Sequence, residues 1–138
     1  MYYCIWRTQT ENDKLDKQRK PRIHQYRLPL EEEWAYVATQ PKSLIVNTKS
    51  VEDLPGPSKC NKPNIWGLYN LEGNVSEWTA SYIKHGNLSD TEKENKQYVV
   101  RGGSWRNNNG ADARIIADQS EKAANIGFRI VRTCLSGR

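Results

Sequence analysis

Large aromatic side chains alternate with glycine and other turn-forming residues through the second half of the chain. The pattern occurs in three runs, Ile65 to Asn70, Gly73 to Trp78 and Gly102 to Trp105. These runs are too irregular for a long helix and too rich in rings for a solvated linker. Because the chain has five Trp but one Phe, the indole rings are the main large side chains available to a core. We therefore expect a folded domain with much irregular backbone, and we interpret the tryptophans as core residues rather than as an exposed binding patch.

The length of the chain predicts one domain over residues 1–138. No run approaches the roughly 18 apolar residues of a membrane helix, and Met1 is followed by no visible export signal. The cysteines, Cys4, Cys60 and Cys134, form no Cys-x-x-Cys pair, so we expect neither a disulfide framework nor a zinc site. These features exclude a membrane span and a visible export signal for this stretch of sequence.

Most of the net charge of +5 lies in the first part of the chain. Between Arg7 and Arg27 there are seven basic and three acidic residues, and residues 12–26 are interpreted as a charged insertion. No aromatic residue lies between Trp6 and Tyr26, which argues against a nucleic-acid partner. The segment is either a solvated helix face or a contact surface for a protein partner.

Two helices are predicted. Tyr2, Ile5 and Trp6 follow helical spacing and predict a helix whose first turns are buried and which ends before Pro21. Residues 30–38 predict a second helix, with three carboxylates in its first turn. The apolar face of this second helix consists of Leu30, Trp34, Val37 and Ala38.

Short strands and long loops are predicted for the rest. Residues 23–28 are expected to be extended, and residues 98–101 and 126–131 read as strands. Residues 39–64 and 84–97 are polar and are predicted to be surface loops.

Six short motifs occur in this chain in the order found in one protein family: Arg27-Leu28-Pro29, Glu31 to Trp34, Gly67 to Asn70, Gly73 to Trp78, Val100 to Trp105 and Gly127 to Arg129. The chain thereby resembles the formylglycine-generating enzyme, or sulfatase-modifying factor, family. The resemblance implies an α+β, C-type-lectin-like fold with two helices, short twisted antiparallel sheets and much irregular loop. It covers the C-terminal half to two-thirds of the family domain, so the family's N-terminal portion is expected to be lacking.

Residues inside these motifs are interpreted as structural. They are Trp34, Trp78, Arg101, Trp105 and Arg129. We expect Trp6 and Phe128 to join Trp34, Trp78 and Trp105 in one core. Arg101 is expected to pair with a carboxylate such as Glu77 or Glu33.

The resemblance does not extend to the catalytic residues. In the catalytic branch it implies two cysteines that bind copper and oxidise a substrate cysteine, and those positions here are Asn107 and Asp112. Amide and carboxylate oxygens cannot replace the soft thiolate sulfur that this chemistry needs. We therefore expect no copper and no enzyme activity.

The resemblance also implies a calcium site. Its ligands would come from Asn70, Gly73, Val75 and Glu77, which supply an amide oxygen, two main-chain carbonyls and one carboxylate. A hard cation prefers such an oxygen shell. The alternative is that Asn70 and Glu77 only satisfy backbone groups in a turn.

One non-catalytic branch resembles the chain in further detail. Cys4 to Thr8, the charged helix extension and Tyr26 to Pro29 are similar to the lipoprotein ring component of the gliding-motility and type IX secretion machinery of Bacteroidetes. This resemblance implies a structural scaffold outside the cytoplasm, in the periplasm or at the cell surface. It also implies protein partners and a homo-oligomer or ring assembly.

A second non-catalytic branch stays open. In the variable proteins of diversity-generating retroelements, the Asn-rich window before the Ile-Gly-Phe-Arg motif forms a ligand-binding face. The candidate ligand-binding residues here are Arg106, Asn107, Asn108, Asn109 and Asp112. We favour the scaffold over ligand display, with a formylglycine-generating oxidase third.

Overall fold

The computed structural model describes residues 2–22, 24–40, 54–59, 62–83, 96–107 and 109–134. The elements, in chain order, are α1 (Tyr2–Lys17), β1 (His24–Arg27), α2 (Glu31–Ala38), β2 (Ser76–Tyr82), β3 (Gln97–Arg101), β4 (Arg114–Asp118), β5 (Ile126–Phe128) and β6 (Val131–Cys134). The α+β class predicted from the sequence is confirmed. None of the described helices is long and apolar enough to cross a membrane.

The chain divides into two compact units. Unit 1 consists of Met1–Pro29 and Arg129–Arg138, and unit 2 consists of Leu30–Phe128. Unit 1 therefore contains α1, β1 and β6, and unit 2 contains α2 and the other four strands. The one domain over residues 1–138 that the length of the chain predicts thus consists of two compact units.

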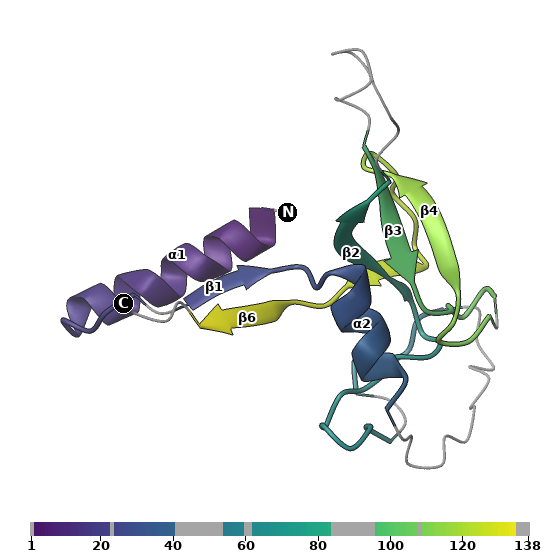
Figure 1. The fold of residues 1–138 in the computed structure, drawn as a ribbon, viewed down its shortest axis with the longest axis horizontal. Helices are drawn as coiled ribbons and strands as arrows, with labels where there is room; N and C mark the ends of the chain where they lie inside the picture. Colours follow the sequence, from purple (N-terminus) through teal and green to yellow (C-terminus); the bar gives the residue numbers. More distant parts are fainter. Residues whose placement is uncertain are drawn as a thin grey trace. The chain divides into compact units, whose positions relative to one another are not determined.

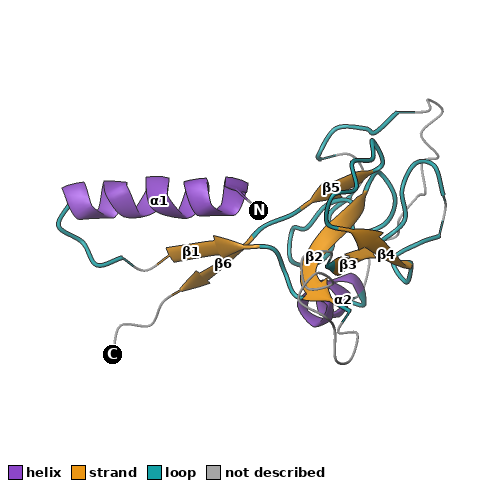
Figure 2. Ribbon diagram, turned by 90° about the horizontal axis from the view of Figure 1, so that it is seen from above, coloured by secondary structure: helices purple, strands orange, loops and turns teal. Residues whose placement is uncertain are grey.

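Unit 1 is a helix lying along a two-stranded ribbon (Figures 1 and 2). β1 and β6 pair antiparallel, with Tyr26 opposite Arg132. The hydroxyl of Thr8 joins α1 to this ribbon, because its Oγ1 accepts the Tyr26 N–H (2.9 Å) and donates to the Cys4 carbonyl (2.8 Å). The outer edge of β1 is thus protected at Tyr26 by a side chain of the helix.

The first turns of α1 are exposed, so the prediction that they are buried is wrong. Cys4 is the buried side chain of this helix, whereas Tyr2, Ile5 and Trp6 face solvent. Helical spacing identified an apolar face correctly, but the ribbon packs on the other side, where Cys4 and Thr8 lie. The predicted charged insertion, residues 12–26, contains the second half of α1, the turn after it and most of β1.

Unit 2 is built on a four-stranded sheet in the order β4-β3-β2-β5. β3 pairs antiparallel with β2 and β4, whereas β5 pairs parallel with β2. The sheet is therefore mixed rather than purely antiparallel. β2 and β4 were not predicted, because turn residues before Ser76 and the charged ends of Arg114–Asp118 hide their alternation.

The strand predicted over residues 126–131 is two strands. β5 belongs to the sheet of unit 2, and β6 pairs with β1 in unit 1. β3 begins at Gln97, one residue inside the predicted loop 84–97. Within the predicted loops, the described residues 54–59 and 62–64 form turns and irregular backbone, while residues 41–53, 60–61 and 84–95 lie outside the described residues.

The buried core of unit 2 forms where α2 packs on the sheet (Figure 1). Its centre consists of Trp34, Ala38, Leu71 and Ala111, with Val37 and Leu68 packed against it. Trp34 is only 1% exposed, and a Cβ on Gly102 would lie 3.1 Å from its ring. Because Gly102 also has a φ of +79°, glycine is required there both by the ring and by the backbone.

The predicted convergence of five rings on one core is only partly correct. Trp34 is buried, and Trp78 and Trp105 are half-buried in unit 2. Trp6 lies in unit 1 and is exposed, and Phe128 is 52% exposed at the end of β5. The alternation of residues 126–131 predicted an inner face for Phe128, whereas Phe128 is the exposed last residue of β5.

The N-terminus of α2 lacks a side-chain cap. Leu30 is the N-cap residue and its side chain makes no capping hydrogen bond. Half of a capping box is present, since the Leu30 N–H donates to Glu33 Oε2 (2.8 Å). The Glu31 N–H donates to Ser81 Oγ on β2 (2.9 Å), which ties the first turn to the sheet.

Replacing Leu30 by Thr should stabilise the protein. Leu30 is exposed, so little packing is lost, and a Thr hydroxyl would accept the Glu33 N–H and complete the box. We expect Leu30→Thr to raise the free energy of unfolding by about 1 kcal/mol, measured by urea denaturation. Leu30→Val, which has the shape of Thr without the hydroxyl, should give no gain; an equal gain in both variants would contradict the capping explanation.

Candidate functional site

Three segments of unit 2 meet at the N-terminal end of strand β2. The Trp105 N–H donates to the Asn74 carbonyl (2.8 Å), and the Ser76 N–H donates to the Asn125 carbonyl (2.9 Å). The buried Ser76 Oγ donates to the Gly102 carbonyl (2.9 Å). The structure therefore brings together the predicted calcium segment and the predicted ligand-binding window, which are about thirty residues apart in sequence.

A buried hydrogen bond joins two of the sequence motifs. The Trp34 Nε1–H donates to Glu77 Oε2 (2.7 Å), and the Glu77 side chain is 7% exposed. Arg101, directly opposite Glu77 in the β2–β3 register, places its guanidinium 5.6 Å from the centre of the Trp34 ring. Trp34 and Arg101, which the sequence analysis interprets as structural, thus lie in contact.

The carboxylate that Arg101 approaches is Glu31, rather than Glu33 or Glu77 as expected. The Nη1 to Oε1 distance is 3.9 Å. Arg114 on β4 makes the closer contact with the same carboxylate, with Nε to Oε1 at 2.6 Å and Nη2 to Oε2 at 3.1 Å. This hydrogen bonding raises the pKa of Arg114. Sequence reasoning used Glu31 only as a helix-dipole residue and missed that it ties α2 to two strands.

Asn107, at the first of the two positions that the resemblance assigns to copper cysteines, is folded back on its own loop. Its Oδ1 accepts from the Ser104 N–H (3.0 Å) and from the Ser104 Oγ–H (2.7 Å), and Ser104 is buried. The two residues also form an isolated β-bridge. A Cβ on Gly103 would lie 3.0 Å from the Gly110 nitrogen, so this loop is tightly closed. Asn107 is therefore a structural residue rather than an open ligand contact.

The other predicted ligand-binding residues are distributed differently. Arg106 and Asn109 are exposed, as is Asp112. The Arg106 guanidinium lies 4.8 Å from the centre of the Trp105 ring, and the Asp112 carbonyl accepts from Arg101 Nη1 (3.3 Å). Asn108 lies outside the described residues. An exposed cation on a ring and two polar side chains can contact a ligand without any change in the fold.

The donors predicted for calcium lie in a sharply curled segment. Asn70, Gly73 and Asn74 have positive φ angles of 53°, 72° and 60°. Asn70 Nδ2 donates to the Pro57 and Ser58 carbonyls (3.2 and 3.0 Å). The set of Asn70, Gly73, Val75 and Glu77 offers only oxygen ligands and so suits a hard cation. With one carboxylate, already bonded to Trp34, it would bind calcium weakly.

The donor set does not suit copper. An amide at position 107 and a carboxylate at position 112 are hard oxygen donors. Among the described residues no group of three or more His, Cys, Asp or Glu could hold a metal ion. Cys4 lies in unit 1, where burial raises the pKa of its thiol and so disfavours the thiolate. Cys60 and the side chain of Cys134 lie outside the described part of the chain.

Comparison with known proteins agrees with this geometry. Residues 44–134 match the family described as sulfatase-modifying factor enzyme 1-like domain. The chain belongs to this family. The family and its fold, predicted from the ordered motifs, are thereby confirmed.

Two solved structures are similar to this sulfatase-modifying-factor domain. CarF is 26% identical with a TM-score of 0.53, and the match covers 79% of this chain and 47% of CarF. Treponema denticola variable protein 1 is 25% identical with a TM-score of 0.58, and the match covers 79% of this chain and 48% of that protein. The chain spans about half the length of these two relatives. No curated protein matches its sequence.

Removing the Asn107 side chain should destabilise unit 2. Asn107→Ala leaves the buried Ser104 hydroxyl and N–H without their side-chain acceptor, so we expect a loss of about 1–3 kcal/mol in the free energy of unfolding. Asn107→Asp keeps an oxygen at the Oδ1 position that accepts both bonds and should lose less. The exposed Asn109→Ala serves as the matched control and should change stability by no more than about 0.5 kcal/mol. Equal urea midpoints for the two alanine variants would show that the Ser104 bonds contribute nothing.

Proposed function

We propose that this chain is a non-catalytic protein-interaction domain of the sulfatase-modifying-factor family. The observation that carries the proposal is the pair of hydrogen bonds from Ser104 to the Asn107 side chain. At the position that the resemblance assigns to the first copper cysteine, the chain therefore has a hydrogen-bonded amide. Asp112 puts an exposed carboxylate at the second place. Oxidation of a substrate cysteine by copper and oxygen needs two soft sulfur ligands, and these two positions provide neither.

The proposed setting is a scaffold outside the cytoplasm, in a gliding-motility or type IX secretion assembly. The support is the likeness of Cys4 to Thr8 and Tyr26 to Pro29 to the ring lipoprotein of that machinery. In such a setting the partners are proteins, and the domain takes part in a homo-oligomer or ring.

A ligand-binding variable protein is the second candidate. It is favoured by the likeness to Treponema denticola variable protein 1 and by the exposure of Arg106, Asn109 and Asp112. Neighbouring genes separate the two candidates. Type IX secretion genes support the scaffold, whereas a reverse transcriptase beside a template repeat matching the codons of Arg106 to Asn109 except at adenines supports ligand display.

The absence of oxidase activity can be tested directly. We expect a cysteine peptide derived from a sulfatase to form no formylglycine when incubated with this chain, Cu(I) and oxygen, because positions 107 and 112 lack thiolates. Mass spectrometry of the peptide gives the readout, and a catalytic member of the family is the positive control. Conversion of the peptide cysteine to formylglycine above the level of Cu(I) alone would overturn the proposal.

We also propose a weak calcium site at Asn70, Gly73, Val75 and Glu77. The support is the all-oxygen donor set and the positive φ angles that curl the main chain around it. Bound calcium would neutralise the buried Glu77 carboxylate and hold the turn before Ser76 against the start of β2.

Calcium should raise the melting temperature if this site binds it. A ligand that binds only the folded state stabilises it by mass action, so we expect an upward shift at millimolar calcium. Glu77→Gln keeps an oxygen acceptor for Trp34 Nε1–H but removes the charge, and it should abolish the shift. Glu121→Gln, an exposed carboxylate at a turn, should leave it unchanged. No shift in the unmodified chain would refute the site.

A further inference from the structure

An apolar patch covers the outward face of α1 in unit 1. Tyr2, Ile5 and Trp6 lie one turn apart and are 90%, 62% and 56% exposed. The ring of Tyr3 packs against Trp6 with centroids 5.6 Å apart. Single exposed apolar residues are ordinary, but a contiguous patch of large ones marks an interaction site.

A groove continues from this patch between α1 and β1. It has a volume of about 390 Å³, and its lining consists of Ile5, Thr8, Gln9, Asn12, Asp13, Arg22, Gln25 and Tyr26. Each of the three amide side chains can both donate and accept hydrogen bonds. An apolar residue at one end and amides along the walls suit a polypeptide, whose main chain offers N–H and C=O groups in alternation.

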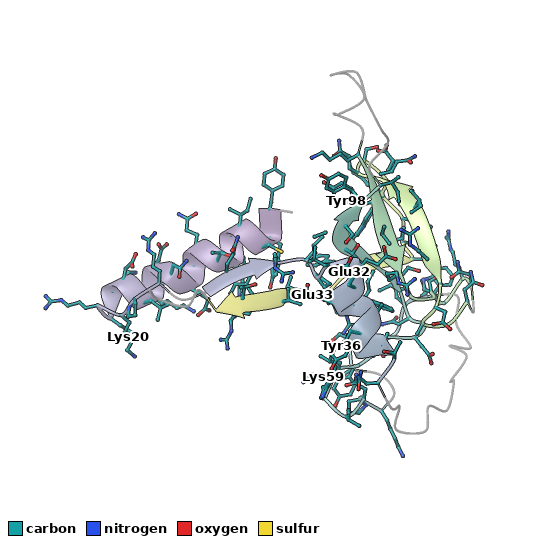
Figure 3. The ribbon with its side chains drawn as sticks, in the orientation of Figure 1. Lys20, Glu32, Glu33, Tyr36, Lys59 and Tyr98 are labelled. Atoms are coloured by element: carbon teal, nitrogen blue, oxygen red, sulfur yellow. The ribbon has the colours of Figure 1, made fainter. Side chains whose placement is uncertain are left out.

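A cluster of cations lies at the other end of the helix. Lys17, Arg19 and Lys20 are exposed, and within the described residues none of them has an ion-pair partner. Figure 3 shows Lys20 at the far end of α1. Two nearby carboxylates, Glu11 and Asp16, are instead engaged by other cations of unit 1, which are Arg7, Lys14 and Arg22.

The backbone holds this cation cluster in an unusual way. The Lys20 N–H donates to the Leu15 carbonyl and the Arg19 N–H to the Asp16 carbonyl (both 2.9 Å), the double closure of a Schellman motif. Arg19 stands at its left-handed position, with φ of 54°, where glycine is preferred. The Arg19 cation therefore occupies a left-handed backbone position that favours glycine.

The charge of unit 1 determines what can cover this surface. Unit 1 contains ten Lys and Arg against three Asp and Glu, a net charge of +7, whereas unit 2 contains eleven against thirteen, a net charge of −2. Two copies meeting through unit 1 would bring together surfaces of the same strong charge, which repel. An acidic partner is complementary.

A membrane surface fits less well than an acidic polypeptide. A helix that lies in a bilayer interface carries its apolar stripe along its length. On α1 the stripe ends after Trp6, and the residues that continue the same face are Gln9, Asp13 and Asp16. Two carboxylates on that face oppose contact with lipid tails.

We propose that unit 1 is the docking surface of this domain, and that its partner is an acidic protein segment. Apolar side chains of the partner pack on Tyr2, Ile5 and Trp6, its main chain lies in the groove, and its carboxylates pair with Lys17, Arg19 and Lys20. The two ends of the surface are separated by about twelve helical residues, or roughly 18 Å, which is the length of five or six extended residues. The proposal rests on the proposed protein-interaction function.

Selection from a phage-displayed library of random peptides of about twelve residues, with the full chain immobilised, tests this surface. We expect enrichment of peptides with Asp or Glu clustered at one end and Leu, Phe or Trp at the other. A selected peptide should bind about tenfold more weakly, by fluorescence anisotropy, to Lys17→Glu/Arg19→Glu/Lys20→Glu and to Ile5→Ser/Trp6→Ser.

The matched control is Lys59→Glu/Lys62→Glu/Lys122→Glu, which makes the same change of net charge on exposed lysines of unit 2 and should bind within about twofold of the unmodified chain. Circular dichroism checks that each variant is folded. If enriched peptides bind all variants equally, the surface is wrong but the protein-interaction function stands. If no peptide is enriched, both fail.

Arg19→Gly separates docking from structure. Glycine relieves the left-handed position, so the melting temperature should rise, while peptide binding should weaken because a cation is lost. If Arg19→Gly binds the peptide as tightly as the unmodified chain does, Arg19 is not part of the docking surface. Two other outcomes would replace the proposed partner: flotation with phosphatidylglycerol vesicles in preference to peptide binding, or a dimer that Ile5→Ser/Trp6→Ser abolishes.

Discussion

The hydrogen bond from the Trp34 indole to Glu77 is the interaction on which unit 2 depends. A buried carboxylate needs a donor, since an unpaired charge in the interior costs several kcal/mol, and the indole N–H supplies one at 2.7 Å. The same ring fills the centre of the core, supports the Arg101 guanidinium and closes over Gly102. Helix α2, the central strands and the loop after β3 therefore all contact the Trp34 side chain. This side chain thereby positions both candidate sites.

Much of unit 2 could be predicted from the sequence because its signals are local. The spacing of Trp34 and Ala38 defines α2, and the run before Arg101 defines β3. β2 and β4 could not be predicted in this way, because turn residues precede Ser76 and the charged ends of Arg114–Asp118 hide the alternation of β4. Helical spacing alone also cannot tell which side of a helix is covered, so Trp6 was expected inside and lies outside.

The candidate site shows the same division. Residue types at positions 107 and 112 were enough to argue against copper, since the chemistry of a thiolate cannot be supplied by oxygen. The residue types alone could not show that the Asn107 side chain accepts a hydrogen bond from Ser104, whereas the exposed Arg106 guanidinium lies over the Trp105 ring. Nor could it identify Glu31 as the residue joining Arg101 and Arg114, because several carboxylates near the start of α2 were equivalent by sequence and only the register of β3 with β4 selects one.

The composition of unit 1 from two distant stretches of chain has a consequence for biosynthesis. Unit 2 is one continuous segment, so it can fold as soon as it has left the ribosome. β1 must instead wait for β6, whose residues pair with it across more than a hundred positions, as His24 does with Cys134. Such long-range pairing is slow, and until it forms, both strand edges are open to chaperones and to other nascent chains.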